Sequence, residues 1–128
     1  MSPDTPVPAH IEQASAQFEA LGFERLAVSA EASESTQVVL LRDRDGVLAE
    51  VIEDKSDIEV ERLVLELTSA LVEPRGVLCT GTAPSLTLWP AELRQIFPGS
   101  TPEQLLWHHE RASRLVRGKG IALEGPKG

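Results

Sequence analysis

Two successive segments with the pattern of a β-hairpin constrain the fold of this chain more than any other feature. Residues 37–42 and 47–52 are rich in aliphatic side chains and flank the sequence Asp43-Arg44-Asp45-Gly46. Asp and Gly tolerate the positive φ angles of a tight reversal, which predicts a hairpin with its turn near Asp45-Gly46. A first strand is predicted before this hairpin, at residues 23–28.

Residues 60–71 fit two kinds of secondary structure. Their aliphatic side chains recur at helical spacing, and the same leucines also alternate with polar residues as in a strand with one wet face. The sequence that follows favours the strand, because Glu73-Pro74-Arg75-Gly76 is typical of a turn and residues 77–82 are short and β-branched. We therefore predict a second hairpin, residues 60–71 with residues 76–82, and the helical alternative stays open at this level.

An N-terminal helix is predicted at residues 9–21. Ile11, Ala14 and Phe18 fall on one stripe of a 3.6-residue period, which gives the helix an apolar face. Gly22 is suited to end this helix in a left-handed conformation.

Two further helices are predicted after the strands. A short one should run from Trp89-Pro90 to Phe97, on the spacing of its apolar residues. A long one should begin at the capping sequence of residues 100–104, where hydroxyl side chains precede Pro, Glu and Gln, and run to about residue 117.

These elements fit a single domain, since 128 residues is a usual domain length. We expect a flexible lead-in at residues 1–8, one α+β domain at residues 9–117 and a flexible basic tail at residues 118–128. Two amphipathic helices need an apolar sheet face to cover. The predicted fold is an antiparallel sheet of four or five strands packed against an N-terminal and a C-terminal helix.

Composition excludes several classes of partner. The chain has 20 acidic residues and 12 Lys and Arg, a net charge of −8, so no nucleic-acid partner is expected. Its longest apolar run is four residues, against the roughly 20 that span a bilayer, so no membrane partner is expected. No secretory leader is apparent, and the single cysteine, Cys79, fits a reducing compartment; we expect a cytoplasmic location.

Residues 38–48 look like the apolar strand and Asp-x-Asp-Gly signature of haloacid-dehalogenase-type phosphatases. In that family the first Asp attacks phosphorus, and the second acts as acid and base beside Mg²⁺. The pattern also requires a later Ser or Thr, a Lys and a late acidic pair, yet here no Asp follows Asp57 and the later lysines lie in the tail. A hairpin turn accounts for the same Asp and Gly residues. No cofactor or metal is therefore expected.

The histidines suggest metal binding at first sight. His108 and His109 are adjacent on the predicted helix, so their side chains diverge by about 100° and cannot easily share one ion. His109 falls on the apolar stripe, which predicts a hydrogen-bonded interior histidine. The alternative is a ligand-binding or catalytic His109 that works with Thr80 or Cys79 at a sheet–helix cleft. Cys79 itself sits mid-strand among apolar neighbours, where a thiol is usually inert.

Two other sets of residues are candidates for partner binding. Trp107 and His108 should lie on the exposed side of the long helix, and Trp is enriched in binding hot spots; the alternative is that the tryptophans complete a small core. Glu53, Asp54 and Asp57 form a predicted acidic face, which is either simply solvated or docks a protein with a basic surface. A homodimer through an exposed sheet edge or the Trp107 face is also compatible with the sequence.

Several short motifs together resemble a small bacterial α+β domain of unknown function. They are Leu21-Gly22-Phe23, Thr68-Ser69-Ala70-Leu71, Gly76-Val77-Leu78-Cys79-Thr80, and Ser100-Thr101-Pro102-Glu103-Gln104-Leu105-Leu106 followed by His109. That group pairs an LGF-ending helix with a Ser-x-Leu hairpin and a terminal helix carrying Leu-Leu-x-x-His. The similarity spans residues 10–117, with residues 73–76 in place of the group's acid-Gly turn. It implies the α+β topology and adds no reaction.

Two functional hypotheses follow from the residues. The first is a non-enzymatic protein-interaction module, because no complete catalytic set is present and the composition is that of small acidic proteins that mask a basic client. The second is a small enzyme or ligand sensor that uses His109 at a sheet–helix cleft.

Overall fold

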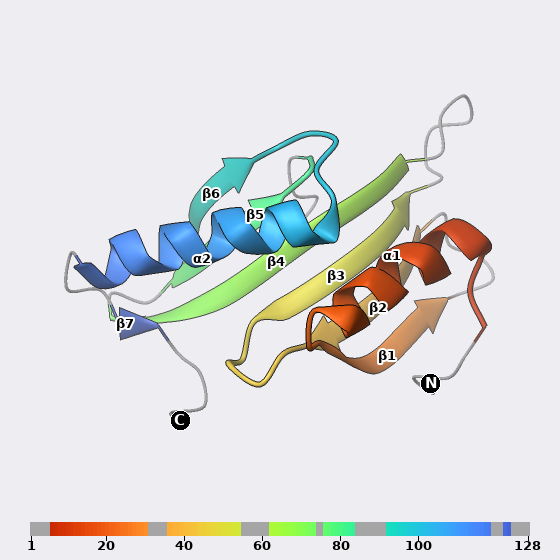
Figure 1. Cartoon of the computed structure of the whole chain (residues 1–128), viewed down its shortest axis with the longest axis horizontal. Coiled ribbons are helices and arrows are strands. Elements are labelled where there is room, and N and C mark those ends of the chain that lie inside the picture. The colour runs from red at the N-terminus through yellow and green to blue at the C-terminus, as the bar shows by residue number, and fades with distance from the viewer. Residues whose placement is uncertain are drawn as a thin grey trace.

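The computed structural model describes residues 6–30, 36–54, 62–73, 76–83, 92–118 and 122–123. Within them the chain forms two helices and seven strands (Figure 1). In chain order these are α1 (Ala9–Ala20), β1 (Glu24–Ala30), β2 (Thr36–Arg42), β3 (Leu48–Asp54), β4 (Arg62–Glu73), β5 (Gly76–Gly81), β6 (Glu92–Ile96), α2 (Pro102–Gly118) and β7 (Ala122–Leu123).

All described strands belong to one sheet with the order β1-β2-β3-β4-β5-β6. Each neighbour pair from β1 to β5 is antiparallel, whereas β6 runs parallel to β5. Both helices cover the same face of the sheet, α1 over β1–β3 and α2 over β4 and β5 (Figure 1). The predicted α+β class, with an antiparallel sheet packed against an N-terminal and a C-terminal helix, is confirmed.

Both predicted hairpins are confirmed. β2 and β3 pair in register from Thr36 opposite Asp54 to Arg42 opposite Leu48, and Gly46 adopts a φ of 85° in the turn. Residues 60–71 were open to two interpretations, and residues 62–73 form the strand β4, which pairs with β5. β3 and β5 flank β4, so the backbone N–H and C=O groups of β4 can form hydrogen bonds on both edges. This favours the strand over the helix.

The short helix predicted from Trp89 to Phe97 is wrong where the structure describes it, because residues 92–96 form β6. The apolar spacing of this segment fits one helical turn, but β5 offers it a complete edge of hydrogen-bonding groups. Five residues make few internal helical bonds, so tertiary pairing decides the outcome. Trp89 lies outside the described residues.

Ala122–Leu123, within the segment predicted as a flexible basic tail, form β7 beside β4. The pairing continues along the part of β4 that extends beyond β3, with a register shift between Leu71 and Glu73.

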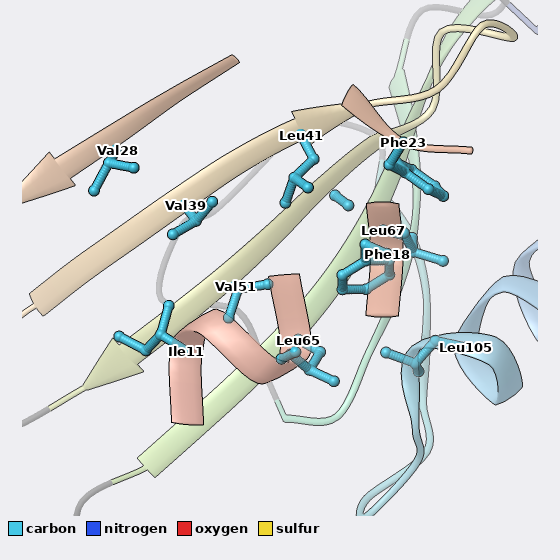
Figure 2. Close-up of a cluster of buried hydrophobic side chains, with 12 residues drawn as sticks. Ile11, Phe18, Phe23, Val28, Val39, Leu41, Val51, Leu65, Leu67 and Leu105 are labelled. Atoms are coloured by element: carbon cyan, nitrogen blue, oxygen red, sulfur yellow. The ribbon is translucent and has the colours of Figure 1, made fainter. Parts of the chain in front are cut away.

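The largest hydrophobic cluster lies between α1 and the sheet (Figure 2). Phe18 is fully buried and meets Phe23 edge to face, with ring centroids 5.3 Å apart. The remaining buried members come from α1, β1–β4 and the start of α2: Ile11, Ala14, Val28, Val39, Leu41, Ala49, Val51, Leu65, Leu67 and Leu105.

Helix α2 begins as its capping sequence predicts. The Gln104 backbone N–H donates to Thr101 Oγ1 at 3.2 Å, and the Thr101 N–H donates to Gln104 Oε1 at 2.9 Å. This reciprocal capping box, with Pro102 in the first turn, fixes where the helix starts. It therefore also fixes which residues of α2 face the sheet.

Candidate functional site: the His109 network and the Trp107 surface

His109 of α2 connects the helix to two strands through its ring nitrogens. Nε2 lies 2.7 Å from Ser69 Oγ on β4, and Nδ1 lies 2.9 Å from Thr80 Oγ1 on β5. Gln95 of β6 extends the chain, because its Nε2 donates to Thr80 Oγ1 at 2.9 Å and to the His108 carbonyl oxygen at 3.1 Å. We refer to Ser69, Thr80, Gln95 and His109 as the His109 network.

The donors in this network favour one tautomer of the imidazole. Gln95 can only donate to Thr80, so the Thr80 hydroxyl proton is free to point at His109 Nδ1. Nδ1 is then the acceptor and Nε2 carries the proton, which it donates to Ser69 Oγ. In this arrangement the three hydrogen bonds from Gln95 to Thr80, from Thr80 to His109 and from His109 to Ser69 run in one direction, from β6 to β4.

Burial holds His109 in its neutral form. The residue is 1% exposed, and this burial lowers the pKa of its imidazole from 6.5 to about 4. Removal from water disfavours the imidazolium, and both ring nitrogens already have neutral hydroxyl partners. At neutral pH the network is therefore a set of uncharged hydrogen bonds in the interior.

The structure brings together two of the residues singled out in the sequence. His109, for which the sequence suggested Thr80 or Cys79 as a partner, is in hydrogen-bond contact with Thr80. Cys79 is buried, but its side chain lies on the opposite sheet face, 4.0 Å from Thr68 Oγ1. Ser69 and Gln95 were missed, although the alternation that places Leu65 and Leu67 on the core face of β4 also places Ser69 there.

The Ser69–His109 contact has the spacing of a nucleophile and its base. A hydroxyl within about 2.6–3.2 Å of an imidazole can be activated if the nitrogen accepts its proton, but in the tautomer described above Nε2 donates to Ser69 instead. Here Ser69 is 4% exposed and Thr80 is fully buried. The network is placed to hold α2 against the sheet, and a substrate would have to reach a hydroxyl that this packing covers.

A second feature of α2 lies on its outer side. Trp107 is 52% exposed, and its ring meets His108 edge to face, with centroids 5.0 Å apart. Arg111 lies over the same indole, 5.5 Å from its centroid. His108 in turn stacks flat on Phe97, with centroids 3.6 Å apart. We call these four residues, Phe97, Trp107, His108 and Arg111, the Trp107 surface.

Of the three residues in the predicted acidic face, the structure describes the side chain of Glu53 alone. Glu53 is not solvated, because it is fully buried and its carboxylate contacts His10 Nε2 of α1. The alternation of β3 places Glu53 on the same face as Ala49 and Val51, which is the face that α1 covers. The backbone of Asp54 ends β3, but its side chain and the whole of Asp57 lie outside the described residues.

The face of the sheet opposite the helices has acidic groups of its own. Glu50 and Glu66 are opposite each other in the β3–β4 register, and Glu66 accepts a 2.9 Å hydrogen bond from Arg94. Burial, with a smaller contribution from the Glu66 charge, raises the pKa of Glu50. Arg94 thus forms an ion pair with one member of this acidic pair, Glu66.

The Asp-Arg-Asp-Gly sequence forms a turn. Asp43 Oδ1 accepts the backbone N–H groups of Asp45 and Val47, both at 2.9 Å. Burial raises the pKa of Asp43, and these N–H groups act in the opposite direction. A surface pocket of about 350 Å³ adjoins this turn. Among the described residues, no group of three or more His, Cys, Asp or Glu is arranged to hold a metal ion.

Neither helix in the described part of the chain has the length and apolar character that crossing a membrane demands. No family model, no curated protein and no solved structure matches this chain. The resemblance to a small bacterial domain therefore stays a prediction.

Proposed function

We propose that this chain is a non-enzymatic protein-interaction module that docks its partner on the Trp107 surface. The observation that carries the proposal is the indole of Trp107, which is more than half exposed and yet has a ring contact with His108 and a cation–π contact with Arg111. Trp and Arg are the residue types most enriched in binding hot spots. A ring already held in place loses little conformational entropy when a partner covers it.

The rest of the molecule supports this assignment. The His109 network anchors the inner side of α2, so the outer side is presented by a helix with a fixed position. The net charge of −8 would steer a partner with a basic surface toward the chain, as electrostatic complementarity raises association rates. Asp54 and Asp57 remain candidates for that steering. Cys79, the sole cysteine, supports a cytoplasmic setting.

The test is capture of the partner with a matched pair of variants. Tagged protein is returned to lysate of its source organism, and co-purifying proteins are quantified by mass spectrometry at low and moderate salt. We expect a stoichiometric partner that is retained by Gln17→Ala, an exposed change on α1, and reduced about tenfold or more by Trp107→Ala. Reversal of Asp54 and Asp57 to Lys should weaken capture most at low salt.

Capture that Trp107→Ala leaves unchanged would exclude this docking surface. The absence of any partner, with both variants folded, would favour the second function. That alternative, an enzyme or ligand sensor centred on His109, is favoured by the 2.7 Å contact between Ser69 Oγ and Nε2, and it requires the other tautomer, in which Nε2 accepts the Ser69 proton. Its test is a survey of phosphoester, ester and thioester substrates for turnover that disappears in His109→Ala and Ser69→Ala.

A further inference from the structure

The surface pocket of about 350 Å³ beside the Asp-Arg-Asp-Gly turn lies where three parts of the fold meet. They are the end of α1, the start of β1 and the turn between β2 and β3, which share one end of the sheet (Figure 1). The lining residues are Gly22, Glu24, Arg42, Asp43, Arg44 and Gly46. Ligand pockets usually measure about 300–1,000 Å³, so this volume suits a small molecule.

Backbone hydrogen bonds hold two walls of this pocket in place. On the α1 side, the Gly22 N–H donates to the Glu19 carbonyl at 3.0 Å, and Gly22 adopts a φ of 100°. A Cβ added at Gly22 would meet nothing within 4 Å, so this wall borders open space. On the turn side, the Asp43 N–H donates to the Val47 carbonyl at 3.0 Å. The pocket is therefore preformed, and a ligand needs little rearrangement of the backbone to enter it.

Arg42 and Arg44 give the pocket its positive charge. Both side chains are exposed, one at the end of β2 and one in the turn that follows. Arg25, the arginine of β1, is instead tied to two glutamates of α1, whereas neither Arg42 nor Arg44 forms an ion pair with a described residue. A guanidinium is a planar fork of N–H donors that fits a carboxylate or a phosphate. Two of them at one pocket indicate an oxyanion on the ligand.

Glu24 and Asp43 add two carboxylates to the same pocket. Glu24 is opposite Arg42 in the β1–β2 register, so their side chains leave the same face of the sheet. Asp43 uses Oδ1 for the turn, and the second oxygen of a carboxylate has lone pairs for another donor. The formal charges of the lining thus balance. A ligand that complements them carries one cationic and one anionic group.

We propose that this pocket binds a small zwitterion, a molecule that carries an ammonium group and either a carboxylate or a phosphate group. The oxyanion binds Arg42 and Arg44. The ammonium group binds the carboxylates of Glu24 and Asp43. Carboxylate and phosphate offer a guanidinium the same oxygen acceptors, so the chemistry of the pocket is shared by both. No lining residue belongs to the Trp107 surface or to the His109 network, and the site does not depend on the function proposed above.

The experiment is a titration of the isotopically labelled chain, followed by its amide NMR signals. Free glycine and phosphoethanolamine are the zwitterionic probes, whereas inorganic phosphate and methylammonium each carry one sign of charge. We expect the zwitterions to shift the amides of residues 22–24 and 42–46. At least one of them should bind about tenfold or more tightly than either single-sign probe, because it engages both pairs of side chains. The tighter zwitterion identifies the oxyanion that the pocket prefers.

Two variants remove one charge of each sign. Arg44→Gln changes an exposed residue of the turn and should weaken binding of the zwitterions about tenfold or more. The matched control is Arg114→Gln, at another exposed arginine, on α2, which should bind them as the wild type does. Asp43→Asn keeps an oxygen for the turn, and it should weaken the zwitterions without weakening inorganic phosphate. If circular dichroism shows that Asp43→Asn does not fold, Glu24→Gln replaces it.

Three results would overturn the proposal. The first is the absence of any saturable shift at residues 22–24 and 42–46 with either zwitterion. The second is inorganic phosphate that binds as tightly as phosphoethanolamine, because the carboxylates would then have no role in recognition. The third is zwitterion binding that Arg44→Gln weakens no more than Arg114→Gln does.

Discussion

Helix α1 and helix α2 cover the same face of one sheet, but they are held to it by different interactions. Under α1 lies the main apolar cluster, centred on the fully buried Ile11 and Phe18. Along most of α2 the apolar contact is small, with Val116 and Leu78 as its buried members. The interior side of α2 is instead occupied by His109 and its hydroxyl partners.

The difference matters because the two kinds of interaction specify position differently. Apolar contacts are non-directional, and a helix packed only by them can shift along the sheet at modest cost. Hydrogen bonds from one imidazole to two strands allow a single rotation and height of the helix. We infer that α1 supplies most of the stability, whereas the His109 network fixes where α2 presents Trp107.

The largest effect is expected from removing the centre of the α1 cluster. Phe18→Ala should lower the free energy of unfolding by about 3–5 kcal/mol, because it leaves a cavity and loses the contact with Phe23. Val116→Ala under α2 should cost only about 1–2 kcal/mol. Urea denaturation followed by circular dichroism measures both. Equal losses would mean that the two helices contribute equally to stability.

The pH dependence of stability isolates His109. In the unfolded chain its imidazole takes a proton below about pH 6.5, but in the folded chain only below about pH 4. Between these values the unfolded state binds more protons, so the free energy of unfolding should fall by about 3 kcal/mol as the pH drops from 6.5 to 4. Above about pH 6.5 His109 is neutral in both the folded and the unfolded state, so its titration no longer lowers the free energy of unfolding.

His109→Gln is the control for this titration, since Gln does not titrate. The raised pKa of Glu50 acts in the opposite direction, because the folded state then holds a proton more readily as the pH falls. The difference between the wild-type and His109→Gln profiles removes that contribution. Parallel profiles from pH 4 to 6.5 would show that His109 titrates normally in the folded chain.

The smallest effect compares two buried serines, one under each helix. Ser69→Ala should cost about 1–3 kcal/mol, because it leaves His109 Nε2 buried without a partner. Ser15→Ala on α1 should change stability by less than about 0.5 kcal/mol, since the Ser15 hydroxyl only bonds back to the Ile11 carbonyl of its own helix. Thermal unfolding of the two variants side by side measures the difference. Similar costs would show that the Ser69–His109 hydrogen bond stabilises the fold no more than the local Ser15 hydrogen bond does.

Much of the fold could be predicted from local patterns. The stripe of Ile11, Ala14 and Phe18 predicted α1, and the capping sequence before Gln104 predicted the start of α2. Asp45-Gly46 predicted the first hairpin turn, because the chemistry of such turns is local. Of the His109 network, the sequence analysis named Thr80 and His109, which are in contact, but not Ser69 and Gln95. A strand pattern shows which residues share a face, but not which of them a distant helix will contact.

The sequence by itself determined the class of the fold, the long helices and the hairpins, because periodicity, caps and turn residues act within a few positions of each other. Only the tertiary structure decided that residues 92–96 pair with β5 as a strand, and that Glu53 is covered by α1. It also decided that His109 reaches Ser69, 40 residues away in the chain. These outcomes depend on which sheet edge and which sheet face are available at each place, and a short segment cannot encode that by itself.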